Sequence, residues 1–214
     1  MSGRILVTGF EPFGKFASNP SWESARRLDG WTVAGRKVTA VRLPVSWRRA
    51  GPALEEALRD LDPEAAVLAG LQGALHVSVE RFAHNLDDAP DADNDGEFRA
   101  GSKIREDGPA AWEATLPVKE IDRRLREAGI PSVLSGSAGF FLCNHAFYRA
   151  MDALAARPGR LAGFLHVPPT LDLDGVRGWP PERVERALRI AVEAAAESLP
   201  SRGSAPADAI RGSP

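Results

Sequence analysis

The sequence predicts an α/β protein: a three-layer α/β/α sandwich with a twisted, mostly parallel, mixed central sheet. Short apolar runs of strand length alternate with patterns of helical period, and this alternation is typical of a sheet covered by helices on both faces. The chain has 214 residues, 43% of them hydrophobic and 26% charged, which suffices for one substantial core. We therefore expect one α/β domain over residues 1–199. The Ser-, Gly-, Pro- and Ala-rich segment 200–214 is expected to be a disordered tail.

Each element follows from an apolar run or an amphipathic pattern. The predicted strands are Ile5–Thr8, Lys37–Val41, Ala65–Leu68, Val77–Arg81, Ser132–Leu134 and Gly163–Val167. The predicted helices are Trp22–Leu28, Ala50–Leu61, Ala110–Ala128, Asn144–Ala156 and Pro181–Ser198. Proline steps at Asp62-Pro63 and Ile130-Pro131 end two of the helices before the next strand begins. Ligands collect at the carboxyl ends of strands in such sheets, and the positions near these ends are the loop after Thr8, Glu80, Cys143 and His166.

Composition excludes several classes of partner. The formal net charge is −2 and the isoelectric point about 6.1, so neither nucleic acid nor an acidic membrane is expected to bind. No apolar run is long enough to span a bilayer, and the first residues resemble the start of a strand rather than a signal peptide. With one cysteine and no signal, we expect a cytoplasmic protein.

Two motifs imitate ligand-binding loops. The run G-F-E-P-F-G-K-F at residues 9–16 nearly spells a phosphate-binding loop, but Phe16 replaces the hydroxyl that would hold magnesium and Glu11 adds a negative charge. Nucleotide binding is therefore not expected. A loop after a first strand rarely exposes two phenylalanines, so Phe10 and Phe13 are expected either to wall a pocket or to pack inward.

The acidic run at residues 91–96 imitates the start of a calcium-binding EF-hand loop. Its twelfth position is Ser102, where such a loop needs a bidentate Glu, so calcium is only a weak hypothesis. We expect no cofactor and no metal. The wider polar segment 87–107 is long for a loop in a compact domain, and such loops are usually mobile or functional.

The single cysteine, Cys143, lies where an apolar stretch meets a helical pattern. A lone thiol forms no internal disulfide, so it is either a small buried hydrophobe or a nucleophile. Unpaired amides and the dipole at a helix start favour thiolate, which favours the nucleophile. Such a nucleophile needs a base, and His166 near a strand end is the best placed, whereas His145 would point away from the thiol. Glu80 is either part of a surface ion pair with its neighbour or the third member of a triad.

From about residue 4 to residue 198 the chain resembles the pyroglutamyl peptidases (pyrrolidone carboxyl peptidases), a family of cysteine peptidases. The motifs that carry the resemblance are Val7-Thr8-Gly9-Phe10-Glu11-Pro12-Phe13-Gly14 with Asn19-Pro20, Val79-Glu80-Arg81, Gly108-Pro109-Ala110-Ala111 with Thr115-Leu116-Pro117, Cys143-Asn144-His145, and Gly163-Phe164-Leu165-His166-Val167-Pro168. They match in content and in order. The resemblance implies an omega-exopeptidase that removes an N-terminal L-pyroglutamyl residue through a thioester, and a homo-oligomer, dimer or tetramer.

The resemblance also implies roles for particular residues. Cys143 would be the nucleophile, His166 the general base and acid, and Glu80 the residue that orients the imidazole. The substrate pocket would be formed by Phe10 and Phe13, which match aromatic residues that sandwich the pyroglutamyl ring, with Asn19 in the same motif and Phe141 as a further wall.

The chain departs from the family pattern at two places. Pro90 occupies the position of an Arg that lies near the oxyanion in family members, and Ala74-Leu75 replaces a Gly-Arg pair. Losing one oxyanion donor typically costs about two to three decades in rate. Replacement donors from the long loop would be Arg99, Lys103 or Arg105. These departures keep two alternatives open: a related cysteine amidase that acts on another cyclic amide, and a catalytically weak lactam-binding homologue.

Overall fold

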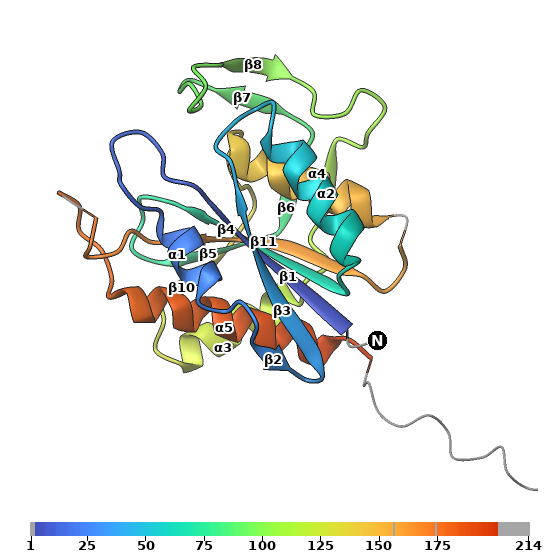
Figure 1. Cartoon of the computed structure of the whole chain (residues 1–214), viewed down its shortest axis with the longest axis vertical. Coiled ribbons are helices and arrows are strands. Elements are labelled where there is room, and N and C mark those ends of the chain that lie inside the picture. Colours follow the sequence, from blue (N-terminus) through green and yellow to red (C-terminus); the bar gives the residue numbers. More distant parts are fainter. Residues whose placement is uncertain (1–2, 156, 174, 201–214) are drawn as a thin grey trace, which may run out of the picture.

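A computed structural model describes residues 3–155, 157–173 and 175–200. Its centre is a seven-stranded sheet with the strand order β10-β5-β11-β4-β1-β3-β2 (Figure 1). The strands of this sheet are β1 (Gly3–Phe10), β2 (Thr32–Val33), β3 (Arg36–Leu43), β4 (Ala65–Leu71), β5 (Val77–Glu80), β10 (Ser132–Ser135) and β11 (Leu161–Val167). The predicted tail 200–214 lies outside the described residues except for Pro200, whose carbonyl accepts a 2.6 Å hydrogen bond from Arg36.

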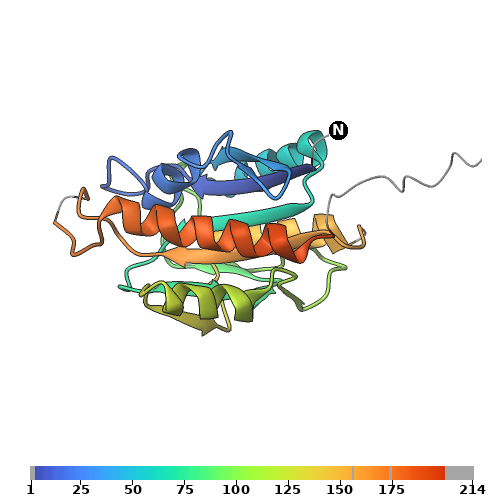
Figure 2. The ribbon, with the colours of Figure 1, turned by 90° about the horizontal axis from the view of Figure 1, so that it is seen from below.

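Helices cover both faces of the sheet, so the predicted three-layer α/β/α architecture is confirmed (Figures 1 and 2). The helices are α1 (Pro20–Arg26), α2 (Ala50–Leu61), α3 (Val118–Glu127), α4 (Leu142–Ala155) and α5 (Pro181–Ser198). Buried residues of α1, α3 and α5 share one hydrophobic cluster, and those of α2 and α4 share another. The sheet separates the two clusters.

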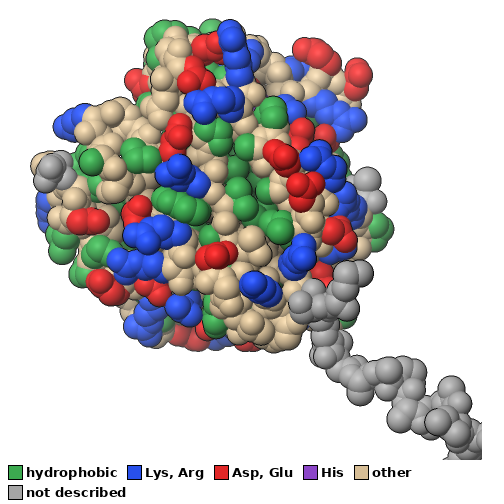
Figure 3. Space-filling view, in the orientation of Figure 1, with side chains coloured by type: hydrophobic (Ala, Val, Ile, Leu, Met, Phe, Trp, Pro, Cys, Tyr) green, Lys and Arg blue, Asp and Glu red, His purple; other side chains and the backbone are tan. Residues whose placement is uncertain are grey.

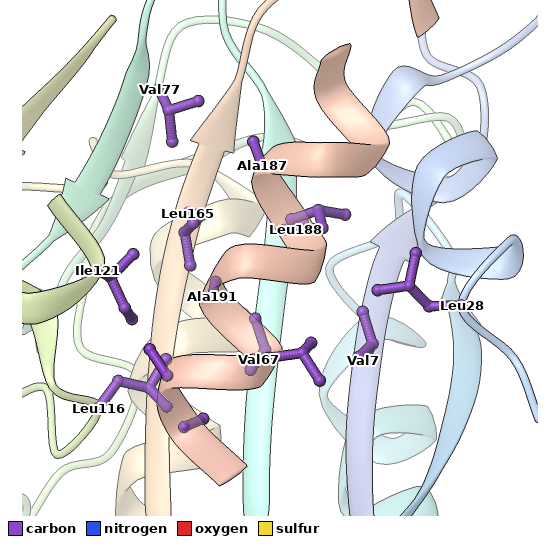
Figure 4. Packing of buried hydrophobic residues seen from close by; sticks show 14 of the residues in the cluster. Val7, Leu28, Val67, Val77, Leu116, Ile121, Leu165, Ala187, Leu188 and Ala191 are labelled. Atoms are coloured by element: carbon purple, nitrogen blue, oxygen red, sulfur yellow. The ribbon is translucent and has the colours of Figure 1, made fainter. Parts of the chain in front are cut away.

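Residue alternation along β1 assigns its side chains to the two layers. Ile5 and Val7 belong to the cluster under α5, whereas Leu6 and Phe10 belong to the cluster under α2 and α4. Figure 4 shows the first cluster, with residues of α5 lying over strand residues such as Val67. Each large apolar side chain buried in this way contributes roughly 1.5–3 kcal/mol of transfer free energy.

The sheet is mixed because three of its strands, β2, β5 and β10, run against the other four. β11 is parallel to β4 but antiparallel to β5, and β10 is parallel to β5. Glu80 is the last residue of β5, so it lies at a strand's carboxyl end as predicted, but β5 runs opposite to β11. Glu80 pairs with Phe164 in the antiparallel ladder, two residues before His166, so it comes close to His166 from the opposite strand direction.

The region between β5 and α3 departs most from the prediction. The helix predicted over 110–128 begins only at Val118, because Pro117 disfavours helical geometry in the residue before it. Residues 111–113 form β9 instead, which pairs with β6. Segment 87–107 contains a further strand pair, β7 with β8. The bounds of these strands are β6 (Phe82–His84), β7 (Asp87–Ala89), β8 (Arg99–Ser102) and β9 (Ala111–Glu113).

The surface agrees with the near-neutral charge of the sequence. On the face shown in Figure 3, acidic and basic side chains are interspersed rather than gathered by sign. Across the ranges that the structure describes, no helix combines the length and apolar character needed to cross a bilayer.

Candidate active site

Three neighbouring strands and one helix bring the predicted catalytic residues together. On β11, His166 is paired with Gly70 of β4 on one side and with Ser78 of β5 on the other. Because paired residues point to the same face, Glu80, which is paired with Phe164, shares that face with His166. The first turn of α4 covers the same face and places Cys143 over Gly70.

His166 links the two other residues. Its Nδ1 lies 2.8 Å from Oε1 of Glu80, whose side chain is almost fully buried. Since Nδ1 is engaged by the carboxylate, Nε2 is the nitrogen left for the thiol. Burial lowers the pKa of His166, but the charge of Cys143 and its hydrogen bond to the ring, together with Glu80, outweigh burial and raise the pKa to about 10. This environment favours the charged imidazolium form of His166.

The backbone before α4 presents Cys143 at the start of the helix. Gly139 has a φ of +73°, a conformation that glycine adopts without strain, and its N–H donates to the Ser137 hydroxyl at 3.2 Å. The helix then begins at Leu142. The first N–H groups of a helix have no intrahelical acceptor, so they are available to an anion bound beside Cys143.

Gly70 leaves the space that the thiol occupies. A Cβ at this position would lie 2.7 Å from Cys143 Sγ and 2.8 Å from Cζ of Phe164. Both distances are well inside van der Waals contact, so a methyl group here must push the thiol, the aromatic ring or both aside.

We expect Gly70→Ala to lower kcat/KM for the substrate of this site by about 100-fold, because misplacing a reacting group by about 1 Å has an effect of that size. Gly73→Ala is the matched control, since a Cβ there meets nothing within 4 Å. Steady-state kinetics of both variants tests the expectation. Equal activity of the two variants would show that the thiol position does not depend on Gly70.

An aromatic cavity opens beside the thiol. It has a volume of about 100 Å³ and is lined by Phe10, Phe13, Phe16, Asn19, Val45, Leu71, Phe141, Leu142 and Cys143. All four predicted pocket residues are among them. The rings of Phe13 and Phe141 lie 5.4 Å apart with their planes tilted by 43°. A small, flat, weakly polar group suits the space between such faces.

Four lining residues were not predicted. Phe16 lies in the run that imitates a phosphate loop, so its aromatic side chain was a usable signal. Val45, Leu71 and Leu142 gave none, because an apolar residue in a cavity wall looks like a core residue in sequence. Phe10 was expected either to wall a pocket or to pack inward. It does both, since its side chain is 3% exposed and also lines the cavity.

Polar groups of the first loop are used to shape the cavity. Asn19 caps α1 by accepting from Ser21 N–H at 3.1 Å, and its amide donates to the Glu11 carbonyl at 3.0 Å. The Glu11 carboxylate accepts from Val45 N–H at 2.9 Å and from the Asn94 amide at 3.1 Å. Glu11 therefore ties the loop after β1 to two other segments of the wall.

The acidic run that imitates a calcium loop also has a local role. Asp93 accepts hydrogen bonds from the backbone N–H groups of Trp47, Asp95 and Glu97, at 2.7, 2.9 and 2.8 Å. Asp95 accepts from Arg49 and from a serine hydroxyl, and these hydrogen bonds lower its pKa below the usual value. The run thus anchors segment 45–49, which contributes to the cavity wall.

The two residues after Cys143 fix the first turn of α4. Oδ1 of Asn144 accepts from His84 N–H at 2.8 Å, and its Nδ2 donates to the carbonyls of His84 and Leu86. His145 turns away to Asp87, whose carboxylate lies 2.9 Å from Nδ1. Both members of this His–Asp pair are buried. No local sequence pattern predicts the pair, because its members are 58 residues apart in the chain.

We expect Asp87→Ala to lower the free energy of unfolding by about 3 kcal/mol, because it leaves a buried imidazole without its partner. Urea denaturation measures the difference. Asp88→Ala is the control, since Asp88 is exposed, and it is expected to change stability by less than about 0.5 kcal/mol. Equal stability of the two variants would contradict a structural role for the pair.

The basic residues considered as replacement oxyanion donors do not line the cavity beside Cys143. Arg105 donates from Nη1 to both carboxylate oxygens of Asp152, at 2.6 and 2.8 Å, and lines a different cavity. Lys103 donates to the carbonyl of Glu106. Arg99 pairs with Ala89 in the β7–β8 ladder. The thiol instead lies in the first turn of α4, where helix N–H groups have no intrahelical acceptor.

Comparison with known proteins gives one family. The family model described as "Pyroglutamyl peptidase" matches residues 3–198. The pyrrolidone-carboxylate peptidase of Chromobacterium violaceum is 47% identical over 168 residues, which cover 77% of each protein. That of Bacillus subtilis is 37% identical over 210 residues, which cover 92% of this chain and 94% of the relative.

Solved structures agree with the sequence relatives. The crystal structure of pyroglutamyl peptidase I from Bacillus amyloliquefaciens has a TM-score of 0.85 and 34% identity, and the match covers 91% of this chain and 97% of that one. A mutant pyrrolidone carboxyl peptidase from Pyrococcus furiosus has a TM-score of 0.88 and 35% identity, with 92% and 99% covered. Fold, motif order and near full-length coverage agree, and the chain belongs to the pyroglutamyl peptidase family of cysteine peptidases.

Proposed function

We propose that this protein hydrolyses the amide bond that follows an N-terminal L-pyroglutamyl residue, with Cys143 as nucleophile, His166 as general acid and base, and Glu80 as the group that orients the imidazole. The observation that carries the proposal is the arrangement of His166. Its ring contacts a buried carboxylate through Nδ1 and interacts with the thiol of Cys143, which lines an aromatic cavity.

The acylation step uses the proton that His166 already holds. The Cys143 thiolate attacks the pyroglutamyl carbonyl carbon, and the carbonyl oxygen becomes an oxyanion. Nε2 of His166 then donates its proton to the amide nitrogen, the C–N bond breaks, and the shortened peptide leaves as an amine. The remaining pyroglutamyl group is a thioester on Cys143. Throughout this step Glu80 accepts from Nδ1 and stabilises the imidazolium.

Deacylation reverses the proton's path. His166, now neutral, takes a proton from water, and the resulting hydroxide attacks the thioester carbonyl. The C–S bond breaks, pyroglutamate leaves, and the thiolate and imidazolium are restored. In both steps the oxyanion lies beside the N–H groups that begin α4, which supply the stabilisation expected from an oxyanion hole. Pro90, which has no N–H and is exposed, takes no part.

The cavity accounts for selection of a lactam. Phe13 and Phe141 present ring faces, and Phe10 closes the space from β1. A pyroglutamyl ring is flat and carries no free amine, so it needs no counter-ion there. A proline ring has nearly the same shape but lacks the lactam carbonyl and carries a charged amine, which is costly to bury without a partner.

The proposal is tested by incubating the protein with a peptide that begins with pyroglutamate and with the same peptide beginning with proline. Mass spectrometry of the products is expected to show loss of one pyroglutamyl residue from the first peptide and no change in the second. If the reduced, folded protein hydrolyses neither peptide, the proposal is wrong. Hydrolysis of another cyclic amide, supplied in a parallel assay, would identify a different amidase instead.

We also propose that the protein acts in the cytoplasm as a homo-oligomer, dimer or tetramer. The family resemblance supports this, as does an apolar edge of the sheet: Val133 and Leu134 on edge strand β10 are each 38% exposed. Light scattering on the purified protein measures the subunit number, and a mass equal to one chain at micromolar concentration would exclude the oligomer.

A further inference from the structure

A second and larger cavity adjoins the aromatic one. Its volume is about 310 Å³, and it lies between the loop after β1 and the loop after β11. Its lining residues are Lys15, Phe16, Ala17 and Ser18 from the first loop, and Asp172, Leu173 and Gly175 from the second. Phe16 lines both cavities, so the two spaces adjoin at this side chain. Figures 1 and 2 both place the two loops at the same end of the molecule.

The strand order relates the walls of this second cavity to the reacting residues. β4 lies between β1 and β11, and Cys143 Sγ lies over Gly70 on β4. The aromatic cavity is on the β1 side through Phe10, whereas His166, the proton donor to the leaving amine in the proposed mechanism, is on β11. A substrate whose ring lies against Phe10 therefore extends across β4 towards β11. The two loops that wall the second cavity follow these same two flanking strands.

The wall on the β11 side is held in place by backbone contacts. Leu171 N–H donates to the Trp179 carbonyl at 2.9 Å, and Trp179 N–H donates to the Pro169 carbonyl at 2.8 Å. Leu173 N–H donates to the Thr170 carbonyl at 3.1 Å, and the Leu173 side chain is only 4% exposed. These bonds hold the described part of the β11-side wall against the segment that leads to α5.

The chemistry of the lining indicates what the cavity takes. Phe16 and Leu173 supply apolar surface from opposite walls, and the Lys15 ammonium lies 5.8 Å from the centre of the Phe16 ring. One cation, Lys15, and one anion, Asp172, balance each other, so charge gives no overall preference. An apolar or aromatic side chain is the group that gains most from this surface.

We infer that this second cavity binds the residue that follows pyroglutamate in the substrate and favours a large apolar or aromatic side chain there. The inference rests on the proposed function. In this inference Phe16 is the boundary between the aromatic cavity, which holds the ring, and the second cavity, which holds the leaving group. Ala17 and Leu173 set the size of the leaving-group cavity.

The test compares three substrates that share the pyroglutamyl group. Pyroglutamyl-phenylalanine amide fills the second cavity, pyroglutamyl-glycine amide does not, and pyroglutamamide releases only ammonia. We expect the phenylalanine substrate to have a kcat/KM about tenfold above that of the glycine substrate, the size of effect that an apolar pocket gives. Ala17→Trp, at an exposed position, fills the cavity and is expected to lower the phenylalanine-to-pyroglutamamide ratio of kcat/KM by about tenfold.

The control is Ala100→Trp, an equally bulky change at an exposed position on β8, which is expected to leave that ratio at its wild-type value. Equal kcat/KM for the phenylalanine and glycine substrates, or an unchanged ratio in Ala17→Trp, overturns the leaving-group cavity while hydrolysis itself upholds the peptidase. Hydrolysis of none of the three substrates by the wild type overturns the proposed function and the inference with it.

Discussion

Replacing Cys143 by Ala is expected to lower kcat for pyroglutamyl substrates by roughly a millionfold, the loss seen when an activated nucleophile is removed from a catalytic triad. The reason is that the chain has one cysteine and that its thiol is the group beside His166. Alkylation of the wild type by iodoacetamide is expected to abolish activity for the same reason. Burst and steady-state kinetics with a fluorogenic pyroglutamyl amide measure the effect.

Binding distinguishes a lost nucleophile from a lost pocket. The Cys143→Ala protein keeps the aromatic walls, so 2-pyrrolidone, a bare lactam, is expected to bind it with the affinity it has for the wild type, as measured by calorimetry. Turnover by Cys143→Ala within tenfold of the wild type would exclude Cys143 as the nucleophile.

The second large effect concerns Glu80 and pH. Glu80→Gln is expected to lower kcat by about three to four decades, because the group that holds the imidazolium in place loses its charge. It is also expected to move the alkaline limb of the pH profile to lower pH. In the wild type that limb reports loss of the His166 proton, and the raised pKa of His166 places it at about pH 10. Part of the increase comes from Glu80, so the pKa falls without it.

The same titration contributes to stability with a definite sign. The pKa of His166 is higher in the folded protein, about 10, than its ordinary value of 6.5. Its contribution to the free energy of unfolding is therefore complete below about pH 6.5 and is lost as pH rises through about 10. Denaturation of wild type and His166→Gln over this range measures it. A stability difference that grows with rising pH, or an alkaline limb unmoved in Glu80→Gln, would contradict the proposed coupling.

Local sequence signals predicted the bounds of a helix correctly where it ends at residues that break helices strongly. The helix predicted over Ala50–Leu61 has those bounds in the structure, because Asp62 adopts a left-handed conformation and Pro63 follows it. The helix predicted over 110–128 was too long, because alanines favour a helix locally whereas residues 111–113 pair with β6. That pairing joins segments far apart in the chain, and no local pattern encodes it.

The same distinction holds for the site. Resemblance of motifs pointed to Glu80, Cys143 and His166, and the structure places them together, but the direction of β5 was not readable from residues 77–80. Whether a strand runs parallel or antiparallel depends on which strands lie beside it, and this arrangement is a property of the whole sheet. The anchoring pair Asp87–His145 was missed for the same reason.

The most direct test of the account is covalent labelling by pyroglutamyl chloromethyl ketone, which joins the recognised lactam to a group that captures a nucleophile. We predict loss of activity in step with the addition of one pyroglutamyl-derived group per chain, located by mass spectrometry on Cys143, and no labelling by the prolyl reagent under the same conditions. Label on any other residue, or equal labelling by the prolyl reagent, would contradict a lactam-selective site built around Cys143.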